Sequence, residues 1–515
     1  MVRVLVSRYA GFIPLLPLLL LSACAAGPDF VQPVKPPVDR LVSENLPFHL
    51  AVTPGVVGGE PQTYVIDKDV PANWWTFFQS AELNQMVAQS LQKNPTLQAA
   101  DAALRVAQFS AQSVSGILLP SVGLGAGISR QQVPPAALGS SQGSPVDYNL
   151  YNATVNVSYR LDLFGGVRRT VEGAQAQAEF QKFQLEAAYL SLTSNVVNAA
   201  IRDASQKEQL EATRTILEAQ KNLAQLIQQQ YKIGSVSKID ISSQNTLVAN
   251  SQTQLYAFDK NLAITKNMLI AYMGGYPGTN QIPELKLASL RLPSQIPLVL
   301  PSNLVRQRPD IRAAEAALKA SNAQVGVATA NLLPQFNLSA AYGAEALSSA
   351  ALFGPGSVLW SLGAGLTQPI FQGGALTAQK NAATAAFEQA AAYYQAVVVS
   401  AFQDVANALK ALDTSANTLA STADAEKNAG LNLALVTEQY KLGAINYLAV
   451  LNAQTQYQQA KINLIQAQAD RYTSTAALYA ALGGGWWNRT GPAYSSVQPK
   501  DAVQMTITNN QPEVK

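Results

Sequence analysis

Very few side chains in this sequence could support reactive chemistry. The 515 residues include one cysteine, Cys24, and one histidine, His49. With a single residue of each type, the sequence argues against metal cages built from cysteine and histidine, Cys–His catalysis and internal disulfides. An enzyme would have to rely on carboxylate, serine, lysine or tyrosine side chains alone. A lone thiol such as that of Cys24 can still be modified covalently, for example by the attachment of acyl chains.

The residues before Cys24 have the pattern of a secretory leader. Two arginines precede a short apolar stretch, residues 12–21, which is interrupted by two prolines and is too short to remain in a bilayer as a spanning helix. Leu21-Ser22-Ala23-Cys24 then resembles the bacterial lipobox, in which the leader is cleaved before a cysteine that becomes lipidated. We predict a cleaved signal peptide over residues 1–23 and lipidation of Cys24, with an ordinary cleavage site as the alternative. Ala25, in place of the aspartate that retains lipoproteins at the inner membrane, indicates the outer membrane.

The composition narrows the class of function. The chain is 48% hydrophobic and only 13% charged, against about 25% charged in an ordinary soluble domain. Its formal charge is +3, and Arg3 and Arg8 of the leader account for two of these charges, which leaves +1. This balance argues against a nucleic-acid partner, since there is no basic excess to neutralise phosphates. It favours a structural or transport role.

An internal duplication organises the rest of the chain. Residues 95–104 (PTLQAADAAL) recur as residues 309–318 (PDIRAAEAAL), at an offset of 214. Residues 231–234 (YKIG) recur as residues 440–443 (YKLG), at an offset of 209. Several such matches in the same order indicate two copies of one unit.

This duplication predicts the domain organisation. After the signal peptide, residues 24–81 form a lipidated Pro/Gly-rich N-terminal segment and residues 82–275 the first repeat. Residues 276–302 are a connector of an equatorial region, residues 303–484 the second repeat, and residues 485–515 a C-terminal tail. Each repeat is expected to contain a helix, a β-hairpin, a long helix, a tip and a returning helix.

The hairpins are expected at residues 121–162 and 335–369. Over residues 151–162, apolar side chains alternate with polar ones, which is typical of a strand with one apolar and one polar face. Strands of about ten alternating residues have the length of outer-membrane barrel strands. A water-soluble hairpin that packs on a core is the alternative.

The remaining segments of the repeats are expected to be helical. Residues 166–232 contain no proline and could extend for about 100 Å at 1.5 Å per residue. Residues 373–441 are their counterpart. Two apolar stripes in the first of these segments predict a helix with a neighbour on each side, as in a curved wall. A coiled-coil scaffold is the alternative.

Both long helices are expected to reverse at a capped tip. Gly234 and Gly443 suit the left-handed position that ends a helix. Ser237 and Asn446 follow three residues later and are good N-caps for the returning helices. The predicted tips are residues 231–238 and 440–447.

Four strands cannot close a membrane barrel alone, because the smallest spanning barrels have about eight strands. An open strand edge would leave unpaired backbone groups in lipid. If the strands enter the membrane, several copies of the chain must therefore share one barrel. Three copies supply twelve strands, and their helices would continue as a tube, so the geometry predicts a passive conduit.

Residues 300–315 (LPSNLVRQRPDIRAAE) resemble the signature of the TolC-like outer-membrane factor lipoproteins of tripartite efflux pumps. Residues 27–30 (GPDF), 74–75 (WW) and 481–486 (ALGGGW) also resemble motifs of this family. The resemblance implies a mixed α and β membrane protein, a homotrimer whose duplicated protomers share a twelve-stranded outer-membrane β-barrel continued by a long α-helical periplasmic barrel. It also implies a periplasmic adaptor (membrane fusion protein) and an inner-membrane RND-type transporter as partners. It implies neither catalysis nor a cofactor.

The resemblance also suggests roles for residues of the tips. The residues implied in adaptor docking are Tyr231, Gly234, Ser237, Tyr440, Gly443 and Asn446. TolC-like members narrow the closed pore with acidic residues, and Ala449 and Asn452 stand at the matching positions here. Asp240 is the remaining gate candidate, as the acceptor of a hydrogen bond from Tyr440. The alternative is that Asp240 is a residue of the first helical turn, where the helix dipole favours its charge.

Three other functions remain open from the sequence. A type I secretion channel is an alternative within the channel class. A periplasmic coiled-coil scaffold lipoprotein would explain the helices but would leave four alternating strands without a role. A surface lipoprotein enzyme would need a cluster of reactive side chains, and none is evident.

Overall fold

The computed structural model describes residues 25–34, 36–38, 49–139, 143–278, 281–298 and 301–490. The predicted leader (residues 1–23), Cys24 and residues 491–515 of the predicted tail lie outside the described residues. Contacts divide the chain into two compact units, each made of several segments. The first comprises Met1–Gln32, Arg105–Phe180 and Ala314–Tyr394, and the second comprises Pro33–Leu104, Gln181–Ala313 and Gln395–Lys515.

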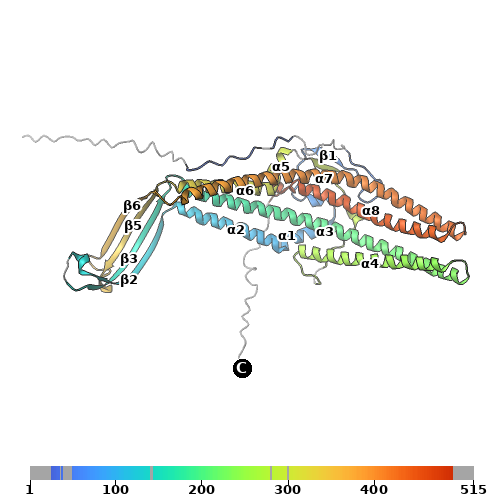
Figure 1. Cartoon of the computed structure of the whole chain (residues 1–515), viewed down its shortest axis with the longest axis horizontal. Helices are drawn as coiled ribbons and strands as arrows, with labels where there is room; N and C mark the ends of the chain where they lie inside the picture. Colours follow the sequence, from blue (N-terminus) through green and yellow to red (C-terminus); the bar gives the residue numbers. More distant parts are fainter. Residues whose placement is uncertain are drawn as a thin grey trace, which may run out of the picture. The chain divides into compact units, whose positions relative to one another are not determined.

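The two repeats contain the same elements in the same order (Figure 1). The first consists of α2 (Pro95–Ser115), β2 (Ser121–Val133), β3 (Val146–Leu161), α3 (Gly166–Lys232) and α4 (Lys238–Tyr272). The second consists of α6 (Pro309–Ala330), β5 (Gln335–Ala346), β6 (Val358–Thr367), α7 (Ala375–Lys441) and α8 (Tyr447–Ala481). Both α3 and α7 have 67 residues, and both α4 and α8 have 35.

The start of α7 differs from the expected helix start at residue 373. Gly373 and Gly374 have φ angles of 58° and 83°, which lie in the left-handed region. A right-handed helix cannot include such residues. The helix therefore begins two residues later, at Ala375.

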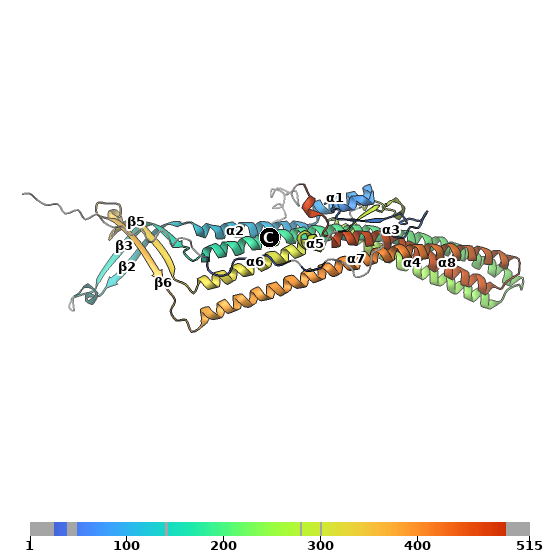
Figure 2. The same cartoon turned by 90° about the horizontal axis from the view of Figure 1, so that it is seen from above.

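The first unit contains a four-stranded sheet in the order β2-β3-β5-β6, and every neighbouring pair is antiparallel. The hairpin of each repeat supplies two strands, and β3 joins β5 across the repeats. Leu161 lies opposite Phe336 and Val155 opposite Tyr342 in this central pairing. The strands lead directly into long helices, as Figures 1 and 2 show.

The second unit contains the main hydrophobic core. Its shorter elements are β1 (Thr63–Ile66), α1 (Ala81–Lys93), β4 (Gln295–Leu298) and α5 (Pro301–Gln307), and β1 pairs with β4 in parallel. Trp74 stacks on Tyr479 with ring centroids 5.8 Å apart, and Phe78 and Met86 are fully buried beside them. These contacts connect the N-terminal segment to α8.

The motif around Arg308 fastens the ends of several helices within the second unit. The Arg308 guanidinium donates to the carboxylates of Asp310 (2.7 Å) and Asp404 (2.9 Å). It also donates to the Ala481 carbonyl (3.1 Å), which is one of the unpaired acceptors at the end of α8. Burial would lower the pKa of Arg308, but the hydrogen bonds and charges of Asp310 and Asp404 outweigh burial and raise that pKa. Arg308 and Asp310 of the signature thus have a structural explanation in this fold.

No helix in the described part of the chain is apolar enough over a sufficient length to cross a membrane.

Candidate functional site

One face of the four-stranded sheet is apolar and open to its surroundings. The register aligns the alternating apolar residues of all four strands on this face, so that Leu124 lies opposite Val155, Val155 opposite Tyr342, and Tyr342 opposite Trp360. The most exposed of these side chains, with exposed fractions between 62% and 82%, are Val122, Leu124, Ile128, Tyr342, Val358, Trp360, Leu362 and Leu366. A face of this kind needs an apolar environment.

The opposite face of the sheet carries small and polar residues. Gly123, Gly125 and Gly127 alternate along β2, and Asn156, Thr154 and Asn152 lie opposite them on β3. A Cβ atom at Gly123 would meet nothing within 4 Å. This face therefore resembles the water-facing interior of a barrel rather than a packed core.

Two edges of the sheet are unpaired within the described residues. They are β2, with 13 residues, and β6, with 10 residues. Such edges present unsatisfied N–H and C=O groups, which either pair with another chain or remain in water. The apolar face extends along both edges, so a lipid environment would require them to pair.

The two helical tips have the same C-terminal capping geometry. Gly234 and Gly443 adopt φ angles of 76° and 74°. The Ser235 N–H donates to the Gln230 carbonyl (3.0 Å), and the Ala444 N–H donates in the same way to the Gln439 carbonyl (2.9 Å). These contacts are of the Schellman type, in which a left-handed glycine lets the chain turn back and satisfy the last carbonyls.

The returning helices begin with side-chain caps. The Ser237 hydroxyl accepts from the Asp240 N–H (3.3 Å), and the Asp240 carboxylate accepts from the Ser237 N–H (2.9 Å), which completes a capping box. At the second tip the Asn446 side chain accepts from the Ala449 N–H (3.3 Å). Ala449 is partly buried and Asn452 is exposed.

The Tyr440 hydroxyl does not use Asp240, the acceptor that the resemblance suggests, in this structure. The Tyr440 hydroxyl donates to Gln230 Oε1 instead (2.8 Å), while the Asp240 carboxylate is engaged in the capping box. Burial, and after it the charge of Asp240, raises the pKa of Tyr440, which favours the protonated hydroxyl as a hydrogen-bond donor. Tyr440 also packs edge-on against Tyr447, with ring centroids 5.7 Å apart.

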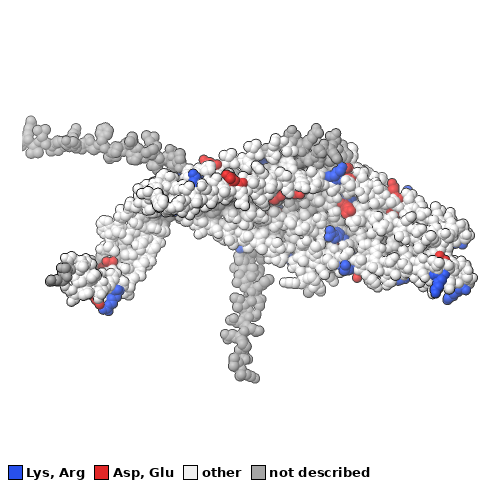
Figure 3. Space-filling model, viewed as in Figure 1, with Lys and Arg blue, Asp and Glu red and all other residues white. Residues whose placement is uncertain are grey.

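The surface of the tips is mixed, with both basic and apolar side chains. Figure 3 shows basic side chains gathered at the far ends of the helices. A groove of about 810 Å³ lies between the tips, lined by residues of both repeats that include Ser237, Asp240, Tyr440 and Asn446. Exposed aliphatic side chains at the tips and in the residue after each tip are Ile233, Ile239, Leu442 and Leu448.

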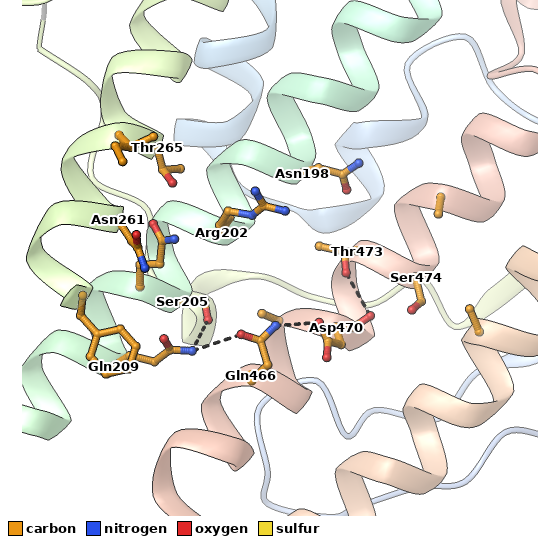
Figure 4. Close-up of a pocket in the computed structure, with 16 residues that line it drawn as sticks. Asn198, Arg202, Ser205, Gln209, Asn261, Thr265, Gln466, Asp470, Thr473 and Ser474 are labelled. Atoms are coloured by element: carbon orange, nitrogen blue, oxygen red, sulfur yellow. Dashed lines mark hydrogen bonds between the residues drawn. The ribbon is translucent and has the colours of Figure 1, made fainter. Parts of the chain in front are cut away.

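A polar trough of about 850 Å³ lies among α3, α4, α7 and α8 in the second unit (Figure 4). Gln209 donates to Gln466 Oε1 (3.3 Å), and Gln466 donates to the Asp470 carboxylate (2.8 Å). Arg202 and Thr265 also line it. The sequence predictions missed this trough, although Arg202 and Gln209 belong to a polar stripe at helical spacing on α3. Such stripes are common on exposed helix faces, so the spacing alone does not single out a trough.

Replacing the tip glycines with alanine is expected to weaken both turns. A Cβ atom at Gly234 or Gly443 would meet nothing within 4 Å, so the left-handed backbone alone should cost about 1–2 kcal/mol at each tip. Hydrogen exchange of the amides at residues 229–238 and 438–447 should accelerate accordingly. Asparagine at the same positions tolerates this backbone and should show a smaller effect. Equal exchange in the alanine and wild-type proteins would contradict the expectation.

Comparisons with known proteins agree with this geometry. The family model of the outer membrane efflux protein matches residues 86–275 and 300–484. The pyoverdine export outer membrane protein OpmQ of Pseudomonas putida is 31% identical over 419 residues, which cover 80% of this chain and 88% of the relative. The toluene efflux pump outer membrane protein TtgF of Pseudomonas putida is 29% identical over 475 residues, which cover 91% and 95% of the two chains.

Solved structures resemble the fold over most of its length. The outer-membrane channel OprN superposes with a TM-score of 0.80 at 26% identity, covering 90% of this chain and all of that one. The open state of the MtrE outer membrane channel of Neisseria gonorrhoeae gives a TM-score of 0.75 at 26% identity, covering 91% of this chain and all of that one. The chain therefore belongs to the outer membrane efflux protein family and is the outer-membrane channel component of an efflux system.

Proposed function

We propose that three copies of this chain close one twelve-stranded barrel in the outer membrane and continue as a helical tube in the periplasm. The observation that carries this proposal is the exposed apolar face together with the two free strand edges of the sheet. In a sheet of four antiparallel strands, β2 and β6 run in opposite directions. Pairing β6 of one copy with β2 of the next therefore continues the antiparallel order, and three such steps form a closed ring.

The barrel would serve as a passive conduit. Its interior would be lined by the small and polar residues of the opposite face, such as Gly125, Asn156 and Ser339. An inner-membrane transporter of the RND type would select the substrate and deliver it through a periplasmic adaptor. The relatives named for pyoverdine export and toluene efflux favour small molecules as the cargo.

The helical tips would dock the adaptor. Their surface combines Lys232, Lys238 and Lys441 with the exposed side chains of Ile233 and Leu442. This combination suits a partner hairpin that presents apolar side chains flanked by acidic ones. Gly234, Ser237, Gly443 and Asn446 would shape the two turns, and Tyr231 and Tyr440 would border the docking surface. Ala449 and Asn452 would leave the pore entrance without an acidic ring.

Acyl chains on Cys24 would add a lipid anchor. Ala25, the residue that follows Cys24 in the sequence, begins a segment that packs against the start of α3 and the second half of α6 within the first unit. The Ala26 N–H donates to the Phe164 carbonyl (2.7 Å), and Arg169 pairs with Asp29 (2.5 Å). The anchor would thus attach where the strands give way to helices.

The mass of the detergent-extracted protein tests this proposal. We expect a species of three chains, and we expect the same species from Cys24→Ala, because a barrel remains integral to the membrane without the lipid. Release of the Cys24→Ala protein to the soluble fraction as a monomer or dimer would contradict the barrel and favour a scaffold lipoprotein. A trimer that co-purifies with a type I secretion adaptor would keep the channel but change the partner.

A further inference from the structure

The segment that follows β6 exposes two large apolar side chains. Ile370 and Phe371 are 94% and 88% exposed. They follow shortly after the C-terminal end of β6, which is one of the two edge strands of the sheet. Side chains of this size normally lose most of their exposure in a folded protein. Their surroundings are therefore incomplete in a single chain.

The first repeat shows how the equivalent positions are used when the edge is paired. At the offset of 209, Ile370 corresponds to Leu161, which is partly buried where β3 pairs with β5. Phe371 corresponds to Asp162, whose carboxylate accepts from the Val167 N–H (2.9 Å) and so caps α3. The second repeat therefore has an exposed aromatic side chain at the position where the first repeat has a capping carboxylate. Such an aromatic side chain suits an apolar neighbour.

The segment before β2 is exposed in the same way at the other free edge. Ile117 is 51% exposed and Leu119 is 69% exposed. At the offset of 214, Leu118 and Leu119 correspond to Leu332 and Leu333, which are both partly buried in the second repeat. Both free edges of the sheet therefore carry apolar side chains at the end of the sheet from which the helices continue.

We infer that Ile370 and Phe371 of one subunit cover the turn of residues 117–119 in the next, and that the internal duplication sets the register of the strands between subunits. This inference rests on the proposed trimeric barrel and adds the contacts that close it. Antiparallel pairing brings the end of β6 beside the start of β2 in the neighbouring copy. The end of β3 lies beside the start of β5 in the same manner within one chain.

The pairing of β3 with β5 within the chain predicts the pairing of β6 with β2 between chains. Adding 209 to the number of a β3 residue gives its counterpart in β6, and subtracting 214 from the number of a β5 residue gives its counterpart in β2. Ser158 lies opposite Ser339, so Thr367 should lie opposite Gly125 of the next subunit. Val157 lies opposite Ala340, so Leu366 should lie opposite Ala126. This register keeps the apolar face continuous around the barrel, whereas a slip by one residue would reverse it.

Cysteine cross-linking tests the register. Thr367→Cys is combined in turn with Gly123→Cys, Gly125→Cys and Gly127→Cys, which place the second thiol at three consecutive positions on the same face of β2. Directly opposed residues lie within disulfide range, whereas diagonal neighbours are about 7–8 Å apart. We expect the Gly125→Cys pair to form covalently linked subunits at least about fivefold more efficiently than the other two pairs.

A disulfide between β2 and β6 can only join two chains. Within one chain, β3 and β5 lie between these strands, which separates them by about 14 Å at 4.7–4.9 Å per strand. The four single-cysteine variants, Thr367→Cys with the β2 glycines retained and each of the three β2 cysteines with Thr367 retained, control for other cross-links. Mass analysis of each variant first shows whether it is trimeric.

The proposed contact of Ile370 and Phe371 with residues 117–119 of the next subunit, here called the apolar cover, is tested by Phe371→Ser. Phe353→Ser is the matched control. Phe353 is 82% exposed and lies between β5 and β6, so it shares the exposure of Phe371 but not its place in the proposed contact. Loss of the buried aromatic side chain should speed subunit dissociation in detergent about tenfold or more, whereas the control should match the wild type.

Each outcome has a defined meaning. Preferred cross-linking at Gly123 or Gly127 would overturn the register, and equal dissociation of the two serine variants would overturn the apolar cover. A trimer without any cross-link would overturn the inferred interface while leaving the proposed channel intact. A protein that is monomeric in membrane extracts would instead contradict the proposed function itself.

Discussion

Replacing Leu362 with arginine is expected to prevent assembly in the outer membrane, whereas replacing the neighbouring Ser361 with arginine is expected to be tolerated. Leu362 lies on the exposed apolar face opposite Ala340, and Ser361 lies on the polar face opposite Ala341. An arginine on the lipid-facing side of a barrel costs about 2–4 kcal/mol near the bilayer midplane. A trimer would carry this cost three times, while the matched variant places the same charge in water.

The comparison is made by membrane fractionation and by the amount of heat-resistant oligomer on gels. Both variants add the same side chain at adjacent positions of β6, so differences in expression or net charge cancel. Equal loss of oligomer in both would show that the apolar face does not contact lipid. Leu124→Arg on β2, with Gly125→Arg beside it, offers the same comparison at the other edge of the sheet.

Replacing Arg308 with alanine is expected to cost about 3 kcal/mol of stability, the range for removing a nearly buried charge that holds several partners. Asp310 and Asp404 would lose their shared cation, and the Ala481 carbonyl at the end of α8 would lose its donor. The midpoint of thermal unfolding, followed by the helical circular dichroism signal in detergent, should fall clearly.

Two variants separate the network of Arg308 from a general effect of charge. Arg308→Lys retains the charge but loses the planar fork that reaches several acceptors, so it should fall between alanine and the wild type. Arg306→Ala, two residues earlier and within α5, removes an exposed arginine and should change stability by less than about 0.5 kcal/mol. A similar loss in Arg306→Ala and Arg308→Ala would contradict the role assigned to the network.

The elements of the fold could be predicted where the local pattern decides the structure. Alternation over residues 151–162 reflects a strand with two different faces, and β3 ends at Leu161 within that range. The proline-free stretch from residue 166 to 232 coincides with α3, because neither a fixed φ angle nor a missing donor interrupts it. Because the two repeats match, each of these patterns occurs twice in the sequence and supports the same prediction in both halves.

Contacts between distant side chains could not be predicted in this way. Arg308 reaches Asp404, which is 96 positions away, and Gln209 reaches Gln466 across 257 positions. That the Tyr440 hydroxyl donates to Gln230 and not to Asp240 in this structure has a related reason. The local capping box offers Asp240 partners only three residues away, and a local partner of this kind needs no distant helix to be placed correctly.

The matched helix lengths constrain how this protein can change. Because α3 and α7 each have 67 residues and α4 and α8 each have 35, deleting seven residues from each of the two helices of one hairpin would shorten that hairpin by about 10 Å relative to the other. Only deletions made at the same level in all four helices would preserve both turns side by side. Length variation among natural descendants of this gene should therefore occur as compensated pairs, and an engineered channel of different reach must be shortened in both halves at once.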